Sequence, residues 1–373
     1  MNDMFVLSEK DLLKLFATIV LATIFFGISG LLFMLLLQWI TRRSYAEESI
    51  KKHGISDVKA SRLGGAAVFF CAFGLVMAAA YSKLLHTGDG PYGAYWWGWF
   101  GVILCALLGL VEDVRNNCLT PMFRLCIKTI IFALVIGGSP FLIPIGLGVP
   151  GLSTLMAQPI IGWGLTVVFC VGFINAINMA DGANGLVPGI LTIAFSVFYM
   201  ETGGFAYATL MTSCALFTIF NVISGRLFLG DAGAYGLGAA LALSGLFLFS
   251  EGVFSAPYLA VMLAYPCIDI LVSLARRRVQ GRSILLPDND HLHNWLHHHC
   301  SNWFRSKTMA NSITGALIVL GTSGVALVGY LGHWWPVTST SWIWVFCGQV
   351  LVYAVAFYTT GVSLPATQTL ERN

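Results

Sequence analysis

The sequence predicts an all-α protein that crosses a membrane many times. Hydrophobic residues make up 57% of the 373 residues, charged residues only 10%, and the mean hydropathy is +0.80. Soluble domains carry about 25% charged residues, so this composition is typical of an integral membrane protein. The apolar runs are long enough for transmembrane helices, which need roughly 20 residues to cross a hydrocarbon core of about 30 Å.

We expect a single integral membrane domain over residues 1–373 with 10 or 11 transmembrane helices. The sequence contains no soluble domain, low-complexity linker or internal repeat. The eleven apolar runs lie near residues 14–40, 63–85, 94–111, 123–147, 160–178, 185–200, 204–222, 234–250, 256–275, 308–331 and 341–363.

The positions of Lys and Arg predict the orientation of these helices, because basic residues accumulate on the cytoplasmic side. If the loop after the first helix is cytoplasmic, 17 of the 20 Lys and Arg residues lie on that side, and Lys10, Lys14 and Lys83 lie opposite. The N-terminus would then be periplasmic and the C-terminus cytoplasmic, and the net charge of +3 gives no indication of nucleic-acid binding. The cytoplasmic loops are expected at 41–62, 112–123, 178–185, 222–233 and 276–307.

Five polar segments interrupt the apolar chain, and the helix spacing allows all of them to face the same side. A membrane protein that only packs its helices has little reason to collect carboxylates, amides, histidines and arginines on one face. We therefore expect a site for a charged, water-soluble substrate there. The segments are 51–65, 112–113, 175–185, 221–233 and 276–299.

Glu112 and Asp113 end the third predicted helix. Adjacent helical residues point about 100° apart, so at most one of the two is expected to face a ligand squarely. That residue could act as a base or a metal partner, while the other orients a nearby Lys or Arg. The alternative is a solvated acidic pair at a helix end.

The segment 175–185 is more specific, because Asn175, Asn178 and Asp181 follow one stripe of a helix. Polar side chains inside the end of an apolar helix are unfavourable unless they meet a partner or a wet cavity. Gly182 and Gly185 then break the helix and allow the backbone to approach a ligand closely. Asx-type capping of a helix end is the alternative.

Asp231 lies in the sequence GDAG at the start of the eighth predicted helix. It could cap that helix, or it could provide a hard oxygen ligand for Mg²⁺ beside a diphosphate. Phe228, three residues earlier, could offer a flat face to a base, although a loop Phe usually only packs.

The last polar segment is basic and rich in histidine. The three arginines at 276–278 follow the ninth predicted helix and are explained by the preference of basic residues for the cytoplasmic side, whereas Arg282 is less well explained in this way. Zinc is the alternative for His291 and His293, but no second His or Cys cluster supplies the remaining ligands. Arg and His together suit phosphate. The five segments are thus suited to phosphoryl transfer from a nucleotide diphosphate, and eleven membrane spans favour a lipid acceptor.

In this order the motifs resemble a known family, the polyprenyl-phosphate N-acetylhexosamine-1-phosphate transferases. This glycosyltransferase 4 family includes phospho-N-acetylmuramoyl-pentapeptide-transferase-like and undecaprenyl-phosphate N-acetylglucosamine-1-phosphate transferase-like branches, and the second branch is the more similar. The resemblance covers residues 42–300. Its motifs are RLGG at 62–65, the acidic pair at 112–113, NAINMADGANGL at 175–186, FLGDAGAYGLG at 228–238 and PDNDHLHNWL at 287–296.

The resemblance implies a Mg²⁺-dependent or Mn²⁺-dependent transfer of a sugar 1-phosphate from a UDP-N-acetylhexosamine to undecaprenyl phosphate. UMP is released, and the product starts a cell-surface polysaccharide. The enzyme would lie in the bacterial inner membrane with its active site on the cytoplasmic face, and a homodimer is one assembly it allows.

The same resemblance implies roles for individual residues. Asp231 would be the main metal ligand, and Asp113 would lie beside the lipid phosphate as the candidate base. Phe228 would stack on uracil. The uridine and metal site would be lined by Asn178 and Asp181, and the diphosphate or sugar would be held by Arg282, His291 and His293. Further candidates are Glu112 for catalysis and Arg62, Asn175 and Asn221 for substrate contact.

The chain departs from the family pattern at three positions. Glu112 replaces a common Asp, and Asn184 replaces the second Asp of DGxDG but still supplies an oxygen as a metal ligand. Asn294 replaces a His found in some branches. Two other functions stay open, an inactive relative and a transporter whose polar pathway is lined by Asn178, Asp181, Asp269 and Lys128, although no inverted repeat supports the latter.

The predicted topology can be tested with a membrane-impermeant thiol reagent. In the variant Asp290→Cys the new thiol should react from the cytoplasmic side, because the loop 276–307 carries the largest excess of basic residues together with 41–62. Lys83→Cys is the matched control and should react from the opposite side. Labelling of position 290 from outside would contradict the whole arrangement.

Overall fold

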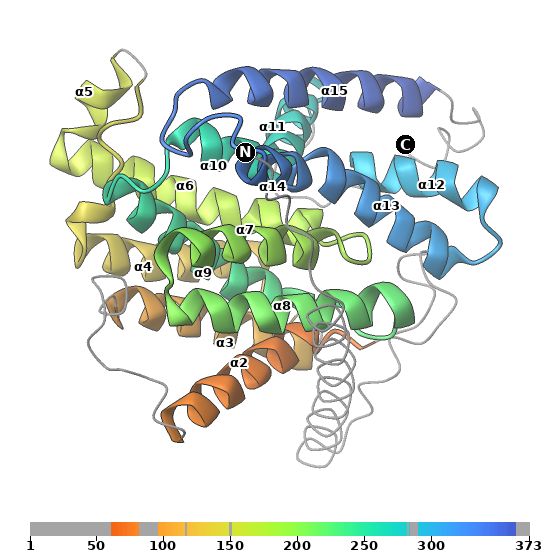
Figure 1. The fold of residues 1–373 in the computed structure, drawn as a ribbon, viewed down its shortest axis with the longest axis horizontal. Coiled ribbons are helices and arrows are strands. Elements are labelled where there is room, and N and C mark those ends of the chain that lie inside the picture. The colour runs from red at the N-terminus through yellow and green to blue at the C-terminus, as the bar shows by residue number, and fades with distance from the viewer. Residues whose placement is uncertain are drawn as a thin grey trace, which may run out of the picture.

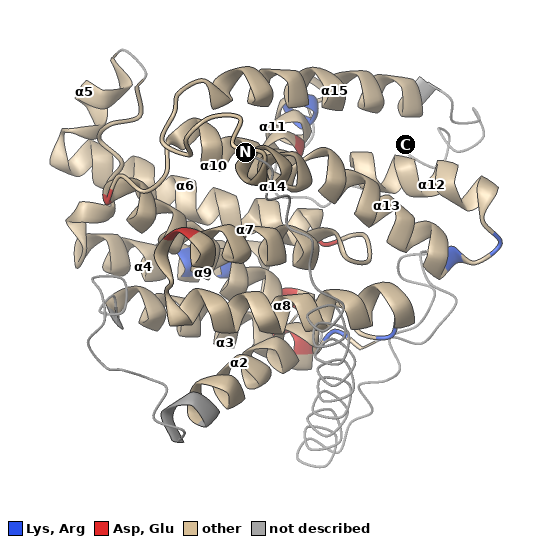
Figure 2. Cartoon of the chain, viewed as in Figure 1, with Lys and Arg blue, Asp and Glu red and all other residues tan. Residues whose placement is uncertain are grey.

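A computed structural model describes residues 61–81, 96–115, 118–148, 151–281, 283 and 290–362 (Figure 1). Regular structure in this part of the chain is helical, apart from a parallel β-bridge between Ser61 and Leu227. Few charged residues interrupt the helices (Figure 2), as expected for segments that face lipid or one another.

The described residues form the following helices in chain order. Their bounds are α2 (Gly64–Tyr81), α3 (Trp96–Arg115), α4 (Pro121–Gly137), η2 (Pro140–Leu142), α5 (Leu152–Met156), α6 (Pro159–Ala180), α7 (Leu186–Thr202), α8 (Phe205–Ser224), α9 (Gly230–Ser250), α10 (Ala256–Met262), α11 (Ala264–Val279), α12 (Leu292–Trp303), α13 (Lys307–Gly321), α14 (Ser323–Leu331) and α15 (Trp342–Val362).

The prediction of an all-α multi-pass membrane protein is confirmed. Five helices (α3, α6, α8, α9 and α15) are long and apolar enough to cross a membrane, and the number rises to seven if two bent pairs each count as one span. Helices α2 and α7 are shorter apolar helices. The predicted run 14–40 lies outside the described residues, so the count of eleven and the orientation stay predictions.

Three runs expected as single helices are interrupted, which corrects the sequence interpretation. The run 256–275 is bent by 83° between α10 and α11, because the ring of Pro266 cannot coexist with the helical carbonyl of residue 262. The run 308–331 is bent by 46° between α13 and α14. In the run 123–147, α4 ends at Gly137, two residues before Ser139, which the following Pro140 disfavours in a helix.

Helix α9 runs through the interior of the bundle, and 94% of its membrane span is buried (Figure 1). Its sequence GDAGAYGLGAALALSG is rich in small residues, which allow neighbouring backbones to approach closely in a membrane protein. A β-carbon at Gly65 would overlap the backbone nitrogen of Gly233, and one at Gly109 would overlap the carbonyl of Asp231. Helices α2 and α3 therefore pack directly against the start of α9.

Backbone hydrogen bonds join the motif RLGG to the motif FLGDAG. The Gly64 N–H donates to the Phe228 carbonyl at 2.9 Å, and the Gly65 N–H donates to the Leu229 carbonyl at 2.7 Å. Gly230 follows with φ +71°, a left-handed conformation that favours glycine. Two motifs separated by more than 160 residues thus form one corner of the molecule.

Gly65→Ala should lower the thermal unfolding midpoint of the purified protein, because its new methyl group meets backbone atoms of α9 that cannot move away easily. Gly74→Ala on the same helix is the matched control, since a β-carbon there meets nothing within 4 Å. The control should be neutral or stabilising by up to about 1 kcal/mol from helix propensity. Equal midpoints for the two variants would contradict the close packing of α2 on α9.

Candidate active site

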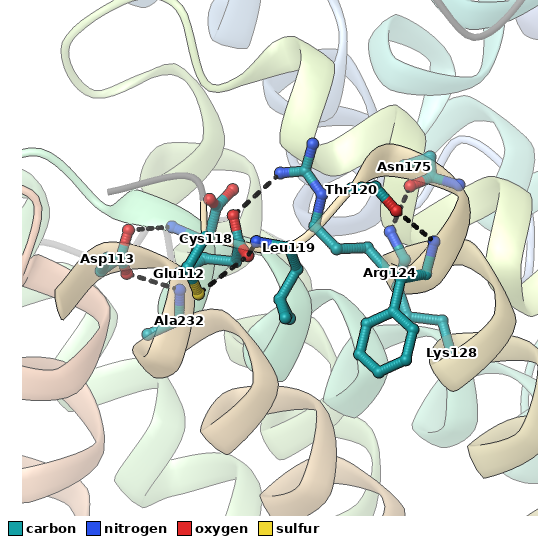
Figure 3. Close-up of polar contacts among 11 residues, drawn as sticks. Glu112, Asp113, Cys118, Leu119, Thr120, Arg124, Lys128, Asn175 and Ala232 are labelled. Carbon is teal, nitrogen blue, oxygen red and sulfur yellow. Dashed lines mark hydrogen bonds and ion pairs between the residues drawn. The ribbon is translucent and has the colours of Figure 1, made fainter. Parts of the chain in front are cut away.

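The site is built where α3 ends and α9 begins (Figure 3). Asp113 is only 4% exposed, and its two carboxylate oxygens accept hydrogen bonds from the backbone N–H groups of Asp231 at 2.9 Å and Ala232 at 2.8 Å. A carboxylate at this place satisfies amides that a helix start leaves unpaired and interacts favourably with the helix dipole. Asp113 therefore caps α9 from another helix, and the idea that Asp231 caps its own helix is wrong.

Glu112 is fully buried and makes contacts different from those of Asp113. Its carboxylate accepts the Leu119 N–H at 2.8 Å and forms an ion pair with Arg124 of α4 at 3.3 Å (Figure 3). The alternative of a solvated acidic pair is thus wrong. The expectation that one of the two carboxylates orients a nearby basic residue is confirmed, with Glu112 in that role.

Lys128, one turn after Arg124 on α4, donates a hydrogen bond to Asn175 Oδ1 of α6 (Figure 3). Its ammonium also lies 4.3 Å from the centroid of the Tyr235 ring, and the residue is 2% exposed. The structure thus gives Asn175, expected to contact substrate, a protein partner. The sequence signal for this pair is a Lys inside an otherwise apolar run. From sequence, Lys128 is interpreted only as one residue of a transport pathway.

Four of the expected ligand-contacting residues have no such partner. Each side chain is partly exposed and makes no side chain–side chain hydrogen bond within the described residues. They come from the end of α6, the loop before α9 and the first turn of α9. The four are Asn178, Asp181, Phe228 and Asp231.

Asp181 and Asp231 are close enough to influence each other. Burial, followed by repulsion from the Asp231 carboxylate, raises the pKa of Asp181 to about 7, although the Gly230 amide and Arg62 act in the opposite direction. Arg62 also interacts electrostatically with Asp113 and Asp231, so it is the cation common to these three carboxylates. Two carboxylates that repel each other are a natural place for a divalent cation.

The described residues fit Mg²⁺ as a shared ion but do not enclose it. No group of three or more His, Cys, Asp or Glu side chains in the described ranges could hold a metal. Mg²⁺ usually takes one or two carboxylates and completes its octahedron with water and substrate phosphates, which suits Asp181 and Asp231. The zinc alternative for the histidines gains no support here.

Asn184, expected as a metal ligand, is anchored to another helix. It is 3% exposed, and its Nδ2 donates to Ser312 Oγ of α13 at 3.3 Å. Its Oδ1 is buried and has no hydrogen-bond partner among the residues that the structure describes. Only this oxygen is therefore available to a ligand.

Asn221 was expected to contact substrate, and the structure corrects this. Its Oδ1 accepts the Gly185 N–H at 2.6 Å, its Nδ2 donates to the Leu227 carbonyl at 2.7 Å, and it is 3% exposed. Because both ends of the amide are used, Asn221 is a positioning residue. It joins the turn after α6 to the loop before α9.

One of the two motif histidines, His293, lies against the turn after α6, about 110 residues earlier in the chain. A β-carbon at Gly182 would overlap His293 Nε2. His291 and His293 are both buried, and their Nδ1 atoms lie 2.7 Å from Asp269 Oδ2 and 2.7 Å from the Tyr265 hydroxyl. Neither α11 partner was assigned to the site from sequence. Arg282, expected nearby, lies outside the described residues.

Comparisons with known proteins agree with the motifs. Residues 95–249 match the model of glycosyl transferase family 4. The chain is 26% identical over 258 residues to a probable undecaprenyl-phosphate N-acetylglucosaminyl 1-phosphate transferase of Bacillus subtilis (strain 168), covering 65% of this chain and 67% of the relative. It is also 26% identical over 269 residues to a decaprenyl-phosphate N-acetylglucosaminephosphotransferase of Mycobacterium tuberculosis (strain ATCC 25618 / H37Rv), covering 63% and 65%.

A third relative is a phospho-N-acetylmuramoyl-pentapeptide-transferase of Levilactobacillus brevis, 26% identical over 191 residues that cover 48% of this chain and 58% of the relative. The apolar helices together with these similarities indicate the class, a sugar-phosphate transferase with several membrane-spanning helices. Residues 95–249 match glycosyl transferase family 4 and the relatives carry the names expected from the motifs, so the resemblance predicted from the motifs is confirmed.

The different roles of Asp113 and Asp181 predict opposite effects on stability at pH 8 without divalent cations. Asp113→Asn should cost about 1–3 kcal/mol, because an amide cannot accept from both α9 N–H groups. Asp181→Asn should leave the midpoint unchanged or raise it. Its pKa is raised to about 7, so the folded state loses stability as pH rises towards and through that value, and the substitution removes the unfavourable charge.

Thermal unfolding in detergent with EDTA measures both variants. Equal destabilisation by the two substitutions would contradict the assignment of Asp113 as the cap of α9 and of Asp181 as a carboxylate whose charge is unfavourable in the folded state.

Proposed function

We propose that this protein transfers an N-acetylhexosamine 1-phosphate, or a related hexosamine 1-phosphate, from a UDP-sugar to undecaprenyl phosphate or a similar polyprenyl phosphate. UMP leaves, and the product is a polyprenyl-diphosphate sugar. The observation that carries the proposal is the pair of partly exposed carboxylates Asp181 and Asp231, which share Arg62 and have no hydrogen-bonding side-chain partner in the described residues. The names of the relatives supply the class of acceptor and of transferred group.

In the proposed reaction, an oxygen of the lipid phosphate forms a bond to the β-phosphorus of the UDP-sugar. The bond between this phosphorus and the bridging oxygen breaks, and the electron pair leaves with UMP. A phosphate monoester has a second pKa near 6, so much of the acceptor is already dianionic at neutral pH. The reaction therefore needs positioning and charge neutralisation more than a strong base.

The contacts of Asp113 do not suit the expected role of a base. Both of its oxygens are occupied by the amides of Asp231 and Ala232, so it cannot approach the lipid phosphate as a base without releasing the start of α9. We assign it as a positioning residue that holds Asp231. Glu112 is likewise a positioning residue, because its ion pair holds Arg124, whose positive charge interacts with Asp231.

Asp231 and Asp181 would hold Mg²⁺ or Mn²⁺, and the bound ion would neutralise the diphosphate and the departing UMP. Arg62 adds a fixed positive charge beside these carboxylates. Phe228 and Asn178 are partly exposed and would contact the uridine, the ring by stacking and the amide by hydrogen bonding. His291 and His293 would hold the diphosphate or the sugar, together with Arg282.

We place this reaction at the cytoplasmic face of the bacterial inner membrane, where it would begin a cell-surface polysaccharide. The polyprenyl phosphate would reach the site laterally from the bilayer. The transporter alternative gains no support, because Lys128 is paired with Asn175 and Asp269 is bonded to His291 and Tyr353. These groups thus have interaction partners within the protein.

Release of UMP by the purified protein with undecaprenyl phosphate, Mg²⁺ and a panel of UDP-sugars tests the proposal. We expect lipid-dependent and metal-dependent UMP with one or a few donors, and we expect Asp231→Asn to lower kcat by about 10²–10⁴-fold or more. Glu251→Gln, at the exposed end of α9, is the matched control and should keep full activity. Wild-type rates for Asp231→Asn at saturating Mg²⁺ would contradict the metal role, and no UMP from any donor would contradict the function.

A further inference from the structure

Two residues one turn apart on α11 each form a hydrogen bond with the Nδ1 atom of one of the two motif histidines. Asp269 Oδ2 lies 2.7 Å from His291 Nδ1, and the Tyr265 hydroxyl lies 2.7 Å from His293 Nδ1. The imidazole rings are stacked nearly parallel, with centroids 5.4 Å apart and an angle of 6° between their planes. All of these residues are at most 5% exposed, so bulk water does not compete for the contacts.

When Asp269, the partner of His291, is ionised, its carboxylate has no proton to donate and can act only as a hydrogen-bond acceptor. The Asp269 carboxylate also accepts from the Tyr353 hydroxyl at 2.7 Å and from the Leu292 N–H at 3.4 Å. These donors favour its ionised form. The proton between Asp269 and His291 therefore lies on His291 Nδ1.

The partner of His293 behaves differently because a tyrosine hydroxyl both donates and accepts. The Tyr265 oxygen accepts the backbone N–H of His293 at 3.2 Å. Among the described residues, His293 Nδ1 is the only acceptor within reach of the Tyr265 hydroxyl hydrogen. His293 Nδ1 must then be unprotonated, which places the proton of the neutral ring on Nε2.

We propose that Asp269 and Tyr265 are positioning residues that give the two histidines opposite proton patterns. His291 donates from Nδ1 to the Asp269 carboxylate, whereas His293 is a neutral ring that donates from Nε2 to the ligand at the Gly182 turn. That ligand is a phosphate or sugar oxygen of the nucleotide-sugar donor, and this last step rests on the proposed function.

Three observations agree with a neutral His293. Burial lowers its pKa to about 4, with opposition from Asp269 and further lowering by His291 and His297. The rings of His293 and His291 are stacked with centroids 5.4 Å apart, so a positive charge on both rings at once would be unfavourable. Its Nε2 lies against Gly182 and makes no hydrogen bond to any described residue, so a donor hydrogen there is available to a ligand.

Nitrogen-15 NMR of the histidine-labelled protein in detergent tests the proton pattern directly, because protonated and unprotonated ring nitrogens differ strongly in chemical shift. His291→Gln and His293→Gln assign the two rings among the 8 histidines. We expect a protonated Nε2 and a bare Nδ1 for His293, and a protonated Nδ1 for His291. A protonated Nδ1 on His293 in the wild-type protein would overturn the proposal, whether or not the protein is a transferase.

Kinetics test the consequence for the donor substrate. Tyr265→Phe should lower kcat/KM for the UDP-sugar by about 10–100-fold, mainly through KM, a magnitude typical of residues that orient a binding group. In a His293→Gln background the same substitution should have little further effect. Likewise, Asp269→Asn should lower kcat/KM for the UDP-sugar in the wild-type background and should have little further effect in a His291→Gln background.

Tyr330→Phe of α14, whose hydroxyl faces Glu201 away from the histidines, is the matched control and should leave kcat and KM unchanged. Equal losses from Tyr265→Phe with and without His293 would show a merely structural role and would overturn the positioning. A wild-type protein that releases no UMP but shows the expected nitrogen shifts would refute the proposed function and leave the assigned proton pattern standing.

Discussion

The carboxylate of Asp113 on the first amides of α9 is the contact on which the rest of the site depends. Helix α9 is the most buried of the membrane-spanning candidates, so its first N–H groups begin in a region with little water. Unpaired amides there would be unfavourable. Asp113 satisfies two of them from α3, and the glycines of α2 and α3 let those helices approach closely enough to keep it there.

This contact also explains why Asp231 is available for chemistry. An Asp in the first turn of a helix commonly uses its carboxylate to accept hydrogen bonds from the backbone amides of that same helix. Here that task falls to a residue 118 positions earlier in the chain. The polar residues thus divide into those that hold the backbone, such as Asp113, Asn221 and Glu112, and those left for a ligand, such as Asp181 and Asp231.

The sequence alone predicted approximately where most of the described helices lie and that the polar motifs come together. It could not show which helices are broken, because hydropathy counts apolar residues and says nothing about chain direction at Leu263 or Thr322. It also could not assign partners across long separations, such as Lys128 with Asn175 or Asp269 with His291. For that reason the sequence predicts Asn221 as a ligand residue and gives no signal for Tyr265.

The charge balance of the site gives a reason for a neutral histidine donor. Glu112, Asp113, Asp181 and Asp231 are accompanied by Arg62, Arg124 and Lys128, so most local cations already have an acidic neighbour. A further fixed cation would compete with a divalent ion for the carboxylates of Asp181 and Asp231. A neutral N–H donor can orient a phosphate or sugar oxygen without that competition, and the Tyr265 hydroxyl is the group that keeps the ring of His293 in this form.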